Sequence, residues 1–206
     1  MNIEPLLGYA VLGGVAYLVG SFPTALIVAA VFKHVDLRST GSGNFTVYNT
    51  FFRVGKIPGL LVLLWNIVAA LIVLRCAHMF FPSDAVAMLT AITGVTVGSM
   101  WQVFARFRGS RGTTTLAFAL FVAEPALWAA CVAAWILALL PRRRTTDATP
   151  ALHAMLPIIF GVIAGSWTYA VAGGLLGTLL QIKRRYSNDD TVSLGLFRRF
   201  GINVNR

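Results

Sequence analysis

The feature that most constrains this chain is the way its positive charges alternate with long apolar stretches. Of the 17 lysines and arginines, all but Arg75 fall in every second gap between these stretches or in the tail. Short loops rich in Lys and Arg stay on the cytoplasmic side of a membrane. The pattern therefore predicts a protein that crosses a membrane several times and keeps its basic loops on one side. The basic positions are Lys33, Arg38, Arg53 and Lys56, then Arg106, Arg108 and Arg111, then Arg142, Arg143 and Arg144, and finally Lys183, Arg184, Arg185, Arg198, Arg199 and Arg206.

The composition agrees with a membrane location. Apolar residues make up 57% of the chain and charged residues only 12%, whereas a soluble globular domain carries about 25% charged residues. The formal net charge of +10 could suit nucleic acid, but it is confined to short gaps, where membrane proteins keep such charge. We therefore expect one polytopic membrane domain over residues 1–206, no nucleic-acid partner, and anionic headgroups or phosphorylated substrates as ligands.

Charge also decides how many times the chain crosses the membrane. The later apolar stretches, residues 113–140 and 151–182, contain 28 and 32 residues, which is long for one span of about 20 residues and short for two. Five spans would place Arg142, Arg143 and Arg144 opposite the other basic clusters, whereas breaks at 124–125 and near 165–166 place every cluster on one side. The sequence thus predicts an all-α integral membrane protein, a compact seven-helix transmembrane bundle with its N-terminus outside and its C-terminus cytoplasmic. The apolar stretches are residues 5–32, in which Gly20, Ser21 and Pro23 predict a tilt or kink, and residues 57–74, 84–105, 113–140 and 151–182.

The first basic gap contains a loop with the composition of an anion-binding site. Residues 36–44 read Asp-Leu-Arg-Ser-Thr-Gly-Ser-Gly-Asn. The two glycines let the backbone turn several N–H groups toward one point, which suits anionic oxygens. A polar connecting loop with a helix cap would show the same residues, so both interpretations stay open at this point. The candidates are Arg38, which can bind phosphate through two hydrogen bonds, with Gly41, Ser42, Gly43, Asn44, Asn49 and Arg53.

A second basic gap combines glycines, arginines and hydroxyls where a helix is predicted to begin. Residues 107–115 read Phe-Arg-Gly-Ser-Arg-Gly-Thr-Thr-Thr. Backbone N–H groups and the helix dipole both favour an anion at a helix N-terminus. An ordinary basic loop with a capping threonine is the alternative, but two such loops on one membrane face favour anion binding. The candidates are Arg108, Gly109, Ser110, Arg111, Gly112 and Thr113.

The tail offers a third basic segment at residues 183–188, which include Arg185 and Asn188. A juxtamembrane anchor for anionic lipid is the alternative interpretation. Other chemistry is not apparent, because the chain has neither a Ser-His-Asp order nor a paired carboxylate. None of the three histidines begins an H-x4-D motif, and no metal site is visible. We expect neither a metal nor a cofactor.

Residues 20–23, 35–49 and 98–115 resemble motifs of the bacterial acyl-phosphate:glycerol-3-phosphate acyltransferases of the PlsY type. That family reads GS-x-P-T-A and then D-[IV]-R-x-x-GSGN-x-GATN, where this chain has GSFPTA and DLRSTGSGN. Downstream the family has GH-x-x-PVF-x-x-F-x-GGKG-[VT]-A-T, where this chain reads GSMWQVFARFRGSRGTTT. The spacing matches throughout, the similarity covers essentially the whole chain, and the seven-span arrangement also resembles the family.

The resemblance implies an enzyme that moves a fatty acyl group from acyl phosphate to the 1-hydroxyl of glycerol 3-phosphate and so makes lysophosphatidic acid. Its partners would be these two substrates and membrane lipids, and we expect a monomer in the bacterial inner membrane with its active site facing the cytoplasm. Because acyl phosphate is already activated, the protein would orient two anionic substrates and offset charge on the departing phosphate. The candidate catalytic residues are Ser42, Arg111 and Asn188, and the candidate phosphate-binding residues are Arg38, Gly41, Gly43, Asn44, Asn49, Arg53, Arg108, Gly109, Ser110, Gly112, Thr113 and Arg185.

Several polar motif positions differ from the family pattern. The lysine of its GGKG motif is Arg111, which keeps the charge but not the shape or proton chemistry of lysine. The histidine of the second motif is Ser99, and the tail motif H-R-x-N aligns with residues 185–188, where the histidine is replaced. Either arginines rebuild the substrate geometry or catalysis is relaxed. The alternatives to an enzyme are a family member that binds glycerol phosphate or anionic lipid without turnover, and a small transporter or scaffold.

Overall fold

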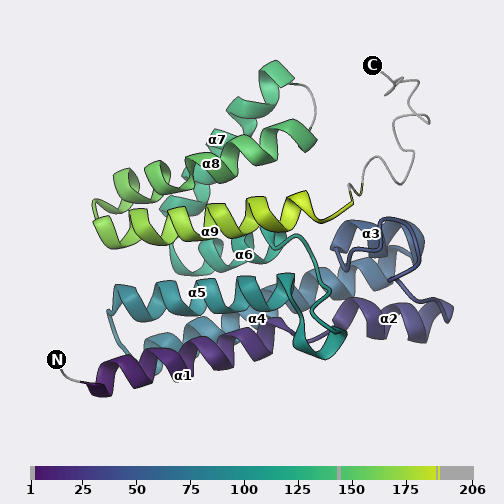
Figure 1. Ribbon diagram of the computed structural model, residues 1–206, viewed down its shortest axis with the longest axis horizontal. Coiled ribbons are helices and arrows are strands. Elements are labelled where there is room, and N and C mark those ends of the chain that lie inside the picture. Colours follow the sequence, from purple (N-terminus) through teal and green to yellow (C-terminus); the bar gives the residue numbers. More distant parts are fainter. Residues whose placement is uncertain (1–2, 143–144, 189, 191–206) are drawn as a thin grey trace.

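The protein is described by a computed structural model that places residues 3–142, 145–188 and 190, and these residues form a helical bundle (Figure 1). The described residues contain no strand, which confirms the predicted all-α class. The elements are α1 (Ile3–Gly20), α2 (Thr24–Lys33), α3 (Val47–Arg53), α4 (Lys56–Phe80), α5 (Ala85–Met100), the 3-10 helix η1 (Val103–Ala105), α6 (Thr113–Ala123), α7 (Pro125–Arg142), α8 (Thr145–Ala164) and α9 (Trp167–Arg185).

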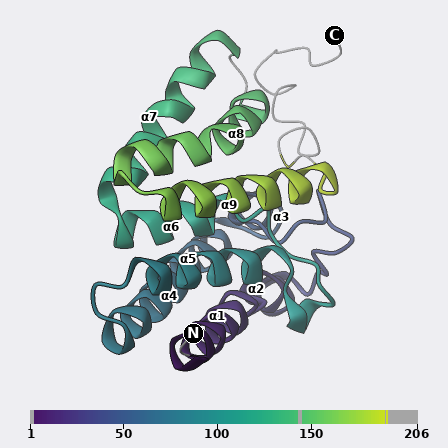
Figure 2. The same cartoon turned by 60° about the vertical axis from the view of Figure 1, so that its left-hand side comes forward.

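The long helices run along the molecule, and the chain reverses at its two ends. At the left end of Figure 1, α4 leads into α5, α6 into α7 and α8 into α9, while α2, α3, the α5–α6 loop and the end of α9 lie at the right. The turned view separates α7 and α8 from α1 and α4, with α6 and α9 between them (Figure 2). The two loops predicted to bind anions and the end of α9 therefore share one end of the bundle.

The apolar stretches at residues 113–140 and 151–182 are each broken into a helical hairpin, as predicted. Helix α6 ends at Ala123 and α7 begins at Pro125, a residue whose missing N–H suits the first turn of a helix. Helix α8 ends at Ala164, Gly165 adopts a left-handed φ of 61°, and α9 begins at Trp167. The breaks are thus confirmed, while the number of membrane crossings and the orientation of the termini stay predictions.

Two other stretches differ from the prediction. The first is not one kinked helix, because α1 stops at Gly20 and α2 starts at Thr24. Pro23 has no N–H with which to continue the helical hydrogen bonds, so the chain breaks there. The stretch predicted over residues 84–105 is α-helical only to Met100. Beyond that residue the chain turns into η1 and the second basic loop.

Long apolar helices with apolar outward side chains suit a lipid surrounding. Glu4–Lys33, which α1 and α2 form together, and Lys56–Phe80 are long and apolar enough to cross a membrane, and four shorter apolar helices accompany them among the described residues. Large apolar side chains such as Leu7, Leu64 and Leu137 are exposed on the helices. An exterior of this kind suits lipid better than water.

A small apolar cluster, separate from the main core, anchors the loops at the basic end. Leu37 and Phe45 belong to it and are 0% and 2% exposed. Because they flank residues 38–44, burial fixes both ends of the first loop. The other buried members of the cluster are Ala25, Val28, Ala29, Val54, Val62 and Ala105.

Candidate active site

The first loop owes its shape to two glycines and one buried asparagine. Gly41 and Gly43 have φ angles of 66° and 76°, a region that residues with a Cβ rarely occupy. Asn49 is completely buried, and its Nδ2 donates to the carbonyl oxygens of Thr40 (3.1 Å) and Asn44 (2.9 Å). Asn49 is not among the described residues that line the cavities beside this loop. Its place therefore fits support of the loop from behind, and not the direct phosphate contact that the sequence suggested.

The second loop packs against the first. The N–H of Ser110 donates to the carbonyl oxygen of Ser99 (2.8 Å). Gly109 lies so close to the same stretch of backbone that an added Cβ would stand 2.4 Å from the Ser99 oxygen. The Gly109 carbonyl in turn accepts the N–H of Phe45 (3.3 Å). The two segments predicted to bind anions are therefore joined directly.

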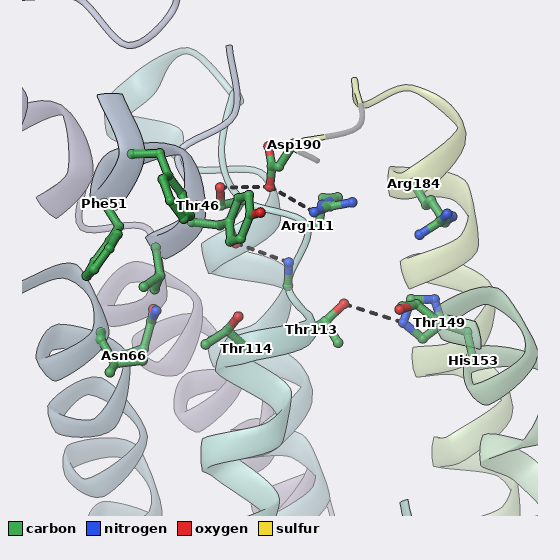
Figure 3. Close-up of a pocket in the computed structure, with 16 residues that line it drawn as sticks. Thr46, Phe51, Asn66, Arg111, Thr113, Thr114, Thr149, His153, Arg184 and Asp190 are labelled. Carbon is green, nitrogen blue, oxygen red and sulfur yellow. Dashed lines mark hydrogen bonds and ion pairs between the residues drawn. The ribbon is translucent and has the colours of Figure 1, made fainter. Parts of the chain in front are cut away.

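Both loops converge on the carboxylate of Asp190 (Figure 3). Its Oδ1 accepts hydrogen bonds from the Ser42 hydroxyl and from Nδ2 of Asn44 (3.0 Å). Its Oδ2 accepts hydrogen bonds from the Thr46 hydroxyl (2.9 Å) and from the Arg111 guanidinium (2.8 Å). The side chain of Asp190 has no exposed surface. We call the four donor residues, Ser42, Asn44, Thr46 and Arg111, the anion cradle.

Asn188 fastens the end of α9 to the first loop. Its Nδ2 donates to the carbonyl oxygen of Ser42 (2.9 Å), and its own carbonyl oxygen accepts Nδ2 of Asn44 (2.7 Å). Ser42, Arg111 and Asn188, the three predicted catalytic residues, therefore meet in space although they come from three different segments. Their catalytic roles stay predictions.

Three residues of this region escaped the sequence analysis. Thr46 caps α3, and its hydroxyl accepts the N–H of Asn49 (3.0 Å), so the three-residue spacing of an N-cap was the signal. Asp190 follows the basic segment at residues 183–188, which the sequence analysis interpreted by its positive charge. His153 is a lone histidine in an apolar stretch, 3% exposed, with Nε2 3.4 Å from the Thr113 hydroxyl. No motif or spacing in the sequence around Asp190 or His153 indicated a place in the site.

A first cavity of about 570 Å³ opens at the cradle and combines an apolar wall with a cationic end. Phe51, Phe52 and Leu63 provide the apolar wall. Arg111 and Arg184 provide the positive charge, and Figure 3 shows Arg111 beside the Asp190 carboxylate and Arg184 on α9, farther from it. Such a cavity suits an amphipathic ligand with an anionic head.

A second cavity of about 460 Å³ is mostly polar. Ser42, Asn44 and Asn188 line it from the cradle side, so the cluster around Asp190 contributes to the walls of both cavities. The cations on its wall are Arg38, Arg108 and Lys183. This second cavity suits a small hydrophilic anion.

The third predicted segment contributes Lys183 and Arg184 beside the expected Asn188, but not the expected Arg185. Arg185 is exposed and is absent from the described lining of both cavities, whereas Arg184 lines the first and Lys183 the second. Successive helical side chains point in directions about 100° apart, so neighbours serve different cavities. Lys183 follows the predicted last span, is 9% exposed, and holds its Nζ 5.4 Å from the centre of the Trp101 ring. Burial lowers the pKa of Lys183 to about 8.

The remaining predicted residues fall into two groups. Ser110, Gly112 and Thr113 line the first cavity where α6 begins, and the Ser110 hydroxyl accepts the N–H of Gly112 (3.1 Å). Arg53 instead packs behind the first loop, where a Cβ added to Gly41 would lie 3.0 Å from its Cγ. Arg53 is not among the described residues that line either cavity. A direct phosphate contact from Arg53, as predicted, has no support in this arrangement.

Proteins that are similar to this chain in sequence share one description. The family model described as glycerol-3-phosphate acyltransferase matches residues 10–191. A glycerol-3-phosphate acyltransferase 2 of Bacillus cereus is 30% identical over 83% of this chain and 85% of its own length. A glycerol-3-phosphate acyltransferase of Desulforudis audaxviator is 30% identical over 91% of this chain and 93% of its own length.

A solved structure carries the same fold. The crystal structure of PlsY (YgiH), an integral membrane glycerol 3-phosphate acyltransferase in its glycerol 3-phosphate form, superposes with a TM-score of 0.73 and 26% identity, and the match covers 87% of this chain and 89% of that one. The all-helical architecture is therefore that of an integral membrane protein. Since the family model spans most of the chain and the relatives are similar over nearly their whole length, this protein belongs to the glycerol-3-phosphate acyltransferase family.

Proposed function

We propose that this protein is a bacterial membrane enzyme that transfers a fatty acyl group from acyl phosphate to glycerol 3-phosphate and so produces lysophosphatidic acid for phospholipid synthesis. The observation that carries the proposal is the anion cradle, in which Ser42 and Asn44 bind one oxygen of the buried Asp190 carboxylate and Arg111 binds the other. Ser42 and Asn44 follow the GSGN motif of the family, and Arg111 stands where its GGKG motif has a lysine. The family match over residues 10–191 supports the same reaction.

The reaction needs positioning more than it needs a nucleophilic side chain. The 1-hydroxyl oxygen of glycerol 3-phosphate bonds to the acyl carbon, the bond from that carbon to the phosphate oxygen breaks, and the hydroxyl proton leaves with the phosphate or with solvent. Negative charge grows on the departing phosphate, where preorganised donors and a guanidinium have their largest effect. Holding both substrates in line reduces the entropic part of the barrier. The cradle supplies such donors without a covalent intermediate.

The two cavities divide the substrates by polarity. The first cavity suits acyl phosphate, because Phe51, Phe52 and Leu63 can contact the acyl chain while Arg111 and Arg184 face the phosphate. The second cavity suits glycerol 3-phosphate, which is small and hydrophilic. Ser42 and Asn44 would then lie where the hydroxyl meets the acyl carbon.

Turnover by the purified protein tests the proposal. Phosphate release from palmitoyl phosphate is followed with and without glycerol 3-phosphate, and lysophosphatidic acid is identified as the product. We expect Ser42→Ala and Arg111→Gln each to lower kcat/KM by about 100-fold, as the loss of one transition-state donor does. Arg75→Gln, which removes an exposed arginine of α4, is the control. Binding of glycerol 3-phosphate without any turnover would point instead to a binding protein.

We also propose the membrane arrangement predicted from charge, with seven spans, an outside N-terminus, a cytoplasmic C-terminus and the site at the cytoplasmic face of the inner membrane. The common location of the basic loops at one end of the bundle supports it (Figure 1). In a variant without Cys76 and Cys131, a cysteine at Ser83 should react with an impermeant maleimide in intact cells, and one at Ser39 only after lysis. Reversed labelling would refute this orientation. Light scattering of the purified protein tests the expected monomer.

A further inference from the structure

The anion cradle is already occupied by a group of the protein itself. The Asp190 carboxylate receives two donors on each oxygen, from Ser42 and Asn44 on Oδ1 and from Thr46 and Arg111 on Oδ2. We propose that Asp190 is an internal competitor, which fills the cradle in place of a substrate phosphate and must leave before that phosphate can bind. The inference rests on the proposed function, since it takes the cradle to be the phosphate-binding part of the site.

The donor set fits a phosphate as well as it fits a carboxylate. A guanidinium binds either group through parallel N–H donors, and hydroxyl and amide donors accept either kind of anionic oxygen. Arg111 lies 2.8 Å from Oδ2 of Asp190 and keeps 24% of its side-chain surface exposed, so it is accessible to a ligand in the first cavity, which it lines. Two oxygens of one phosphate would satisfy the donors that two carboxylate oxygens now satisfy.

The two anions exclude each other. A phosphate bound by Ser42, Asn44 and Arg111 would stand within a few ångströms of the Asp190 carboxylate if that group stayed in place. Like charges so close in a buried site repel strongly. The single guanidinium of the cradle cannot neutralise both. Binding of phosphate therefore requires the carboxylate to leave the cradle or to lose its charge.

A role as the base that deprotonates the substrate hydroxyl fits less well. An ionised carboxylate offers about four lone-pair sites, and four donors of the cradle already engage its oxygens. A substrate hydroxyl would have to displace one of these donors before it could reach Asp190. Competition requires only that all four donors exchange one anion for another.

Asn188 keeps the competitor nearby. Asn188 lies two residues before Asp190. The side-chain amide of Asn188 donates to the Ser42 carbonyl (2.9 Å), and its backbone carbonyl accepts Nδ2 of Asn44 (2.7 Å). A tethered competitor lowers apparent affinity by the fraction of molecules in which the site is open. If the cradle is open in about one tenth of the molecules, removing the carboxylate tightens phosphate binding by about tenfold.

The test measures binding apart from turnover. Calorimetric titrations of wild type, Asp190→Ala and Asp190→Asn use inorganic phosphate, glycerol 3-phosphate and palmitoyl phosphate in separate experiments. We expect about tenfold lower Kd in Asp190→Ala for at least one of the three. A lower Kd in Asp190→Asn is also expected, because the amide keeps the shape without the charge. Glu4→Ala removes one exposed carboxylate on α1 and should leave each Kd unchanged. The ligand with the largest gain identifies the substrate whose phosphate uses the cradle.

Unchanged or weaker binding of all three ligands in the Asp190 variants would overturn the inference, because Asp190 would then support the site. Thermal unfolding of each variant verifies that it is folded, and Asp190→Asn decides alone if the alanine variant does not fold. The proposed function is judged separately. If the Asp190 variants bind more tightly but no lysophosphatidic acid forms, the competitor role of Asp190 is supported and the proposed acyltransferase activity is refuted. If lysophosphatidic acid forms and the affinities are unchanged, the activity is supported and the competitor role is refuted.

Discussion

Replacement of Asn49 by alanine tests whether a buried amide behind the loop controls the site in front of it. The side chain is 0% exposed, and its amide donates to the carbonyls of Thr40 (3.1 Å) and Asn44 (2.9 Å). Each buried acceptor left without its donor costs about 1–3 kcal/mol. Because one of the two carbonyls is only partly enclosed, about 2–4 kcal/mol of loop stability should be lost. Every 1.4 kcal/mol corresponds to a factor of ten, so kcat/KM should fall by about 30- to 700-fold.

The assay is glycerol 3-phosphate-dependent phosphate release from palmitoyl phosphate, with KM measured for both substrates. Both KM values should rise, because Asn44 belongs to the cradle and lines the second cavity. Thr50→Val is the matched control, since Thr50 is also fully buried on α3 but donates only to the Thr46 carbonyl of its own helix. If Asn49→Ala keeps activity within about twofold of wild type while remaining folded, the supporting role assigned to this amide is wrong.

Three further substitutions probe separate parts of the site. Gly109→Ala should lower both the unfolding midpoint and turnover, because an added Cβ would stand 2.4 Å from the Ser99 carbonyl; an unchanged midpoint would show that the loops can separate at no cost. Phe51→Ala should raise KM for palmitoyl phosphate by about tenfold, from about 1–2 kcal/mol of lost apolar contact, and leave KM for glycerol 3-phosphate unchanged. Burial lowers the pKa of Lys183 to about 8, so its charge is present below that pH and lost above it. KM for glycerol 3-phosphate should therefore rise between pH 7 and pH 9 in wild type but not in Lys183→Arg, whose guanidinium stays charged. Identical pH profiles of the two proteins would show that Lys183 does not contact the ligand in the second cavity.

The sequence predicts the helical layout well because charge and chain breaks are local signals. The break before Pro125 follows from an amide without a hydrogen, and the break at Gly165 from a left-handed backbone. The same reasoning underestimated Pro23, where the structure shows two helices and not a kink. How far the backbone bends at a proline depends on what packs beside it, which a linear pattern does not contain.

The site is predicted less completely, because its main contacts are remote in sequence. Glycines and hydroxyls in the two loops indicated anion binding, and the structure places Ser42 and Arg111 around one carboxylate. Which face of α9 turns inward is decided by helix packing, so Lys183 and Arg184 were not distinguished from Arg185. Asp190 meets the loops only through tertiary contacts, and no spacing rule links a tail aspartate to a loop serine.

This arrangement explains why an arginine suits position 111. The family motif that the sequence resembles has a lysine there, a compact and strongly hydrated charge, whereas a guanidinium is planar and holds its charge at any physiological pH. Arg111 is three-quarters covered and faces a carboxylate with no exposed surface. A buried carboxylate is tolerated only when a charge and further donors compensate for its lost hydration. The proposed competition thus joins Arg111 to Asp190: the carboxylate compensates the guanidinium while no substrate is bound, and the substrate phosphate replaces a partner of the same charge sign. An empty cradle leaves the guanidinium uncompensated in a partly dry cavity, so the open state should be the minor one, as the proposed competition requires.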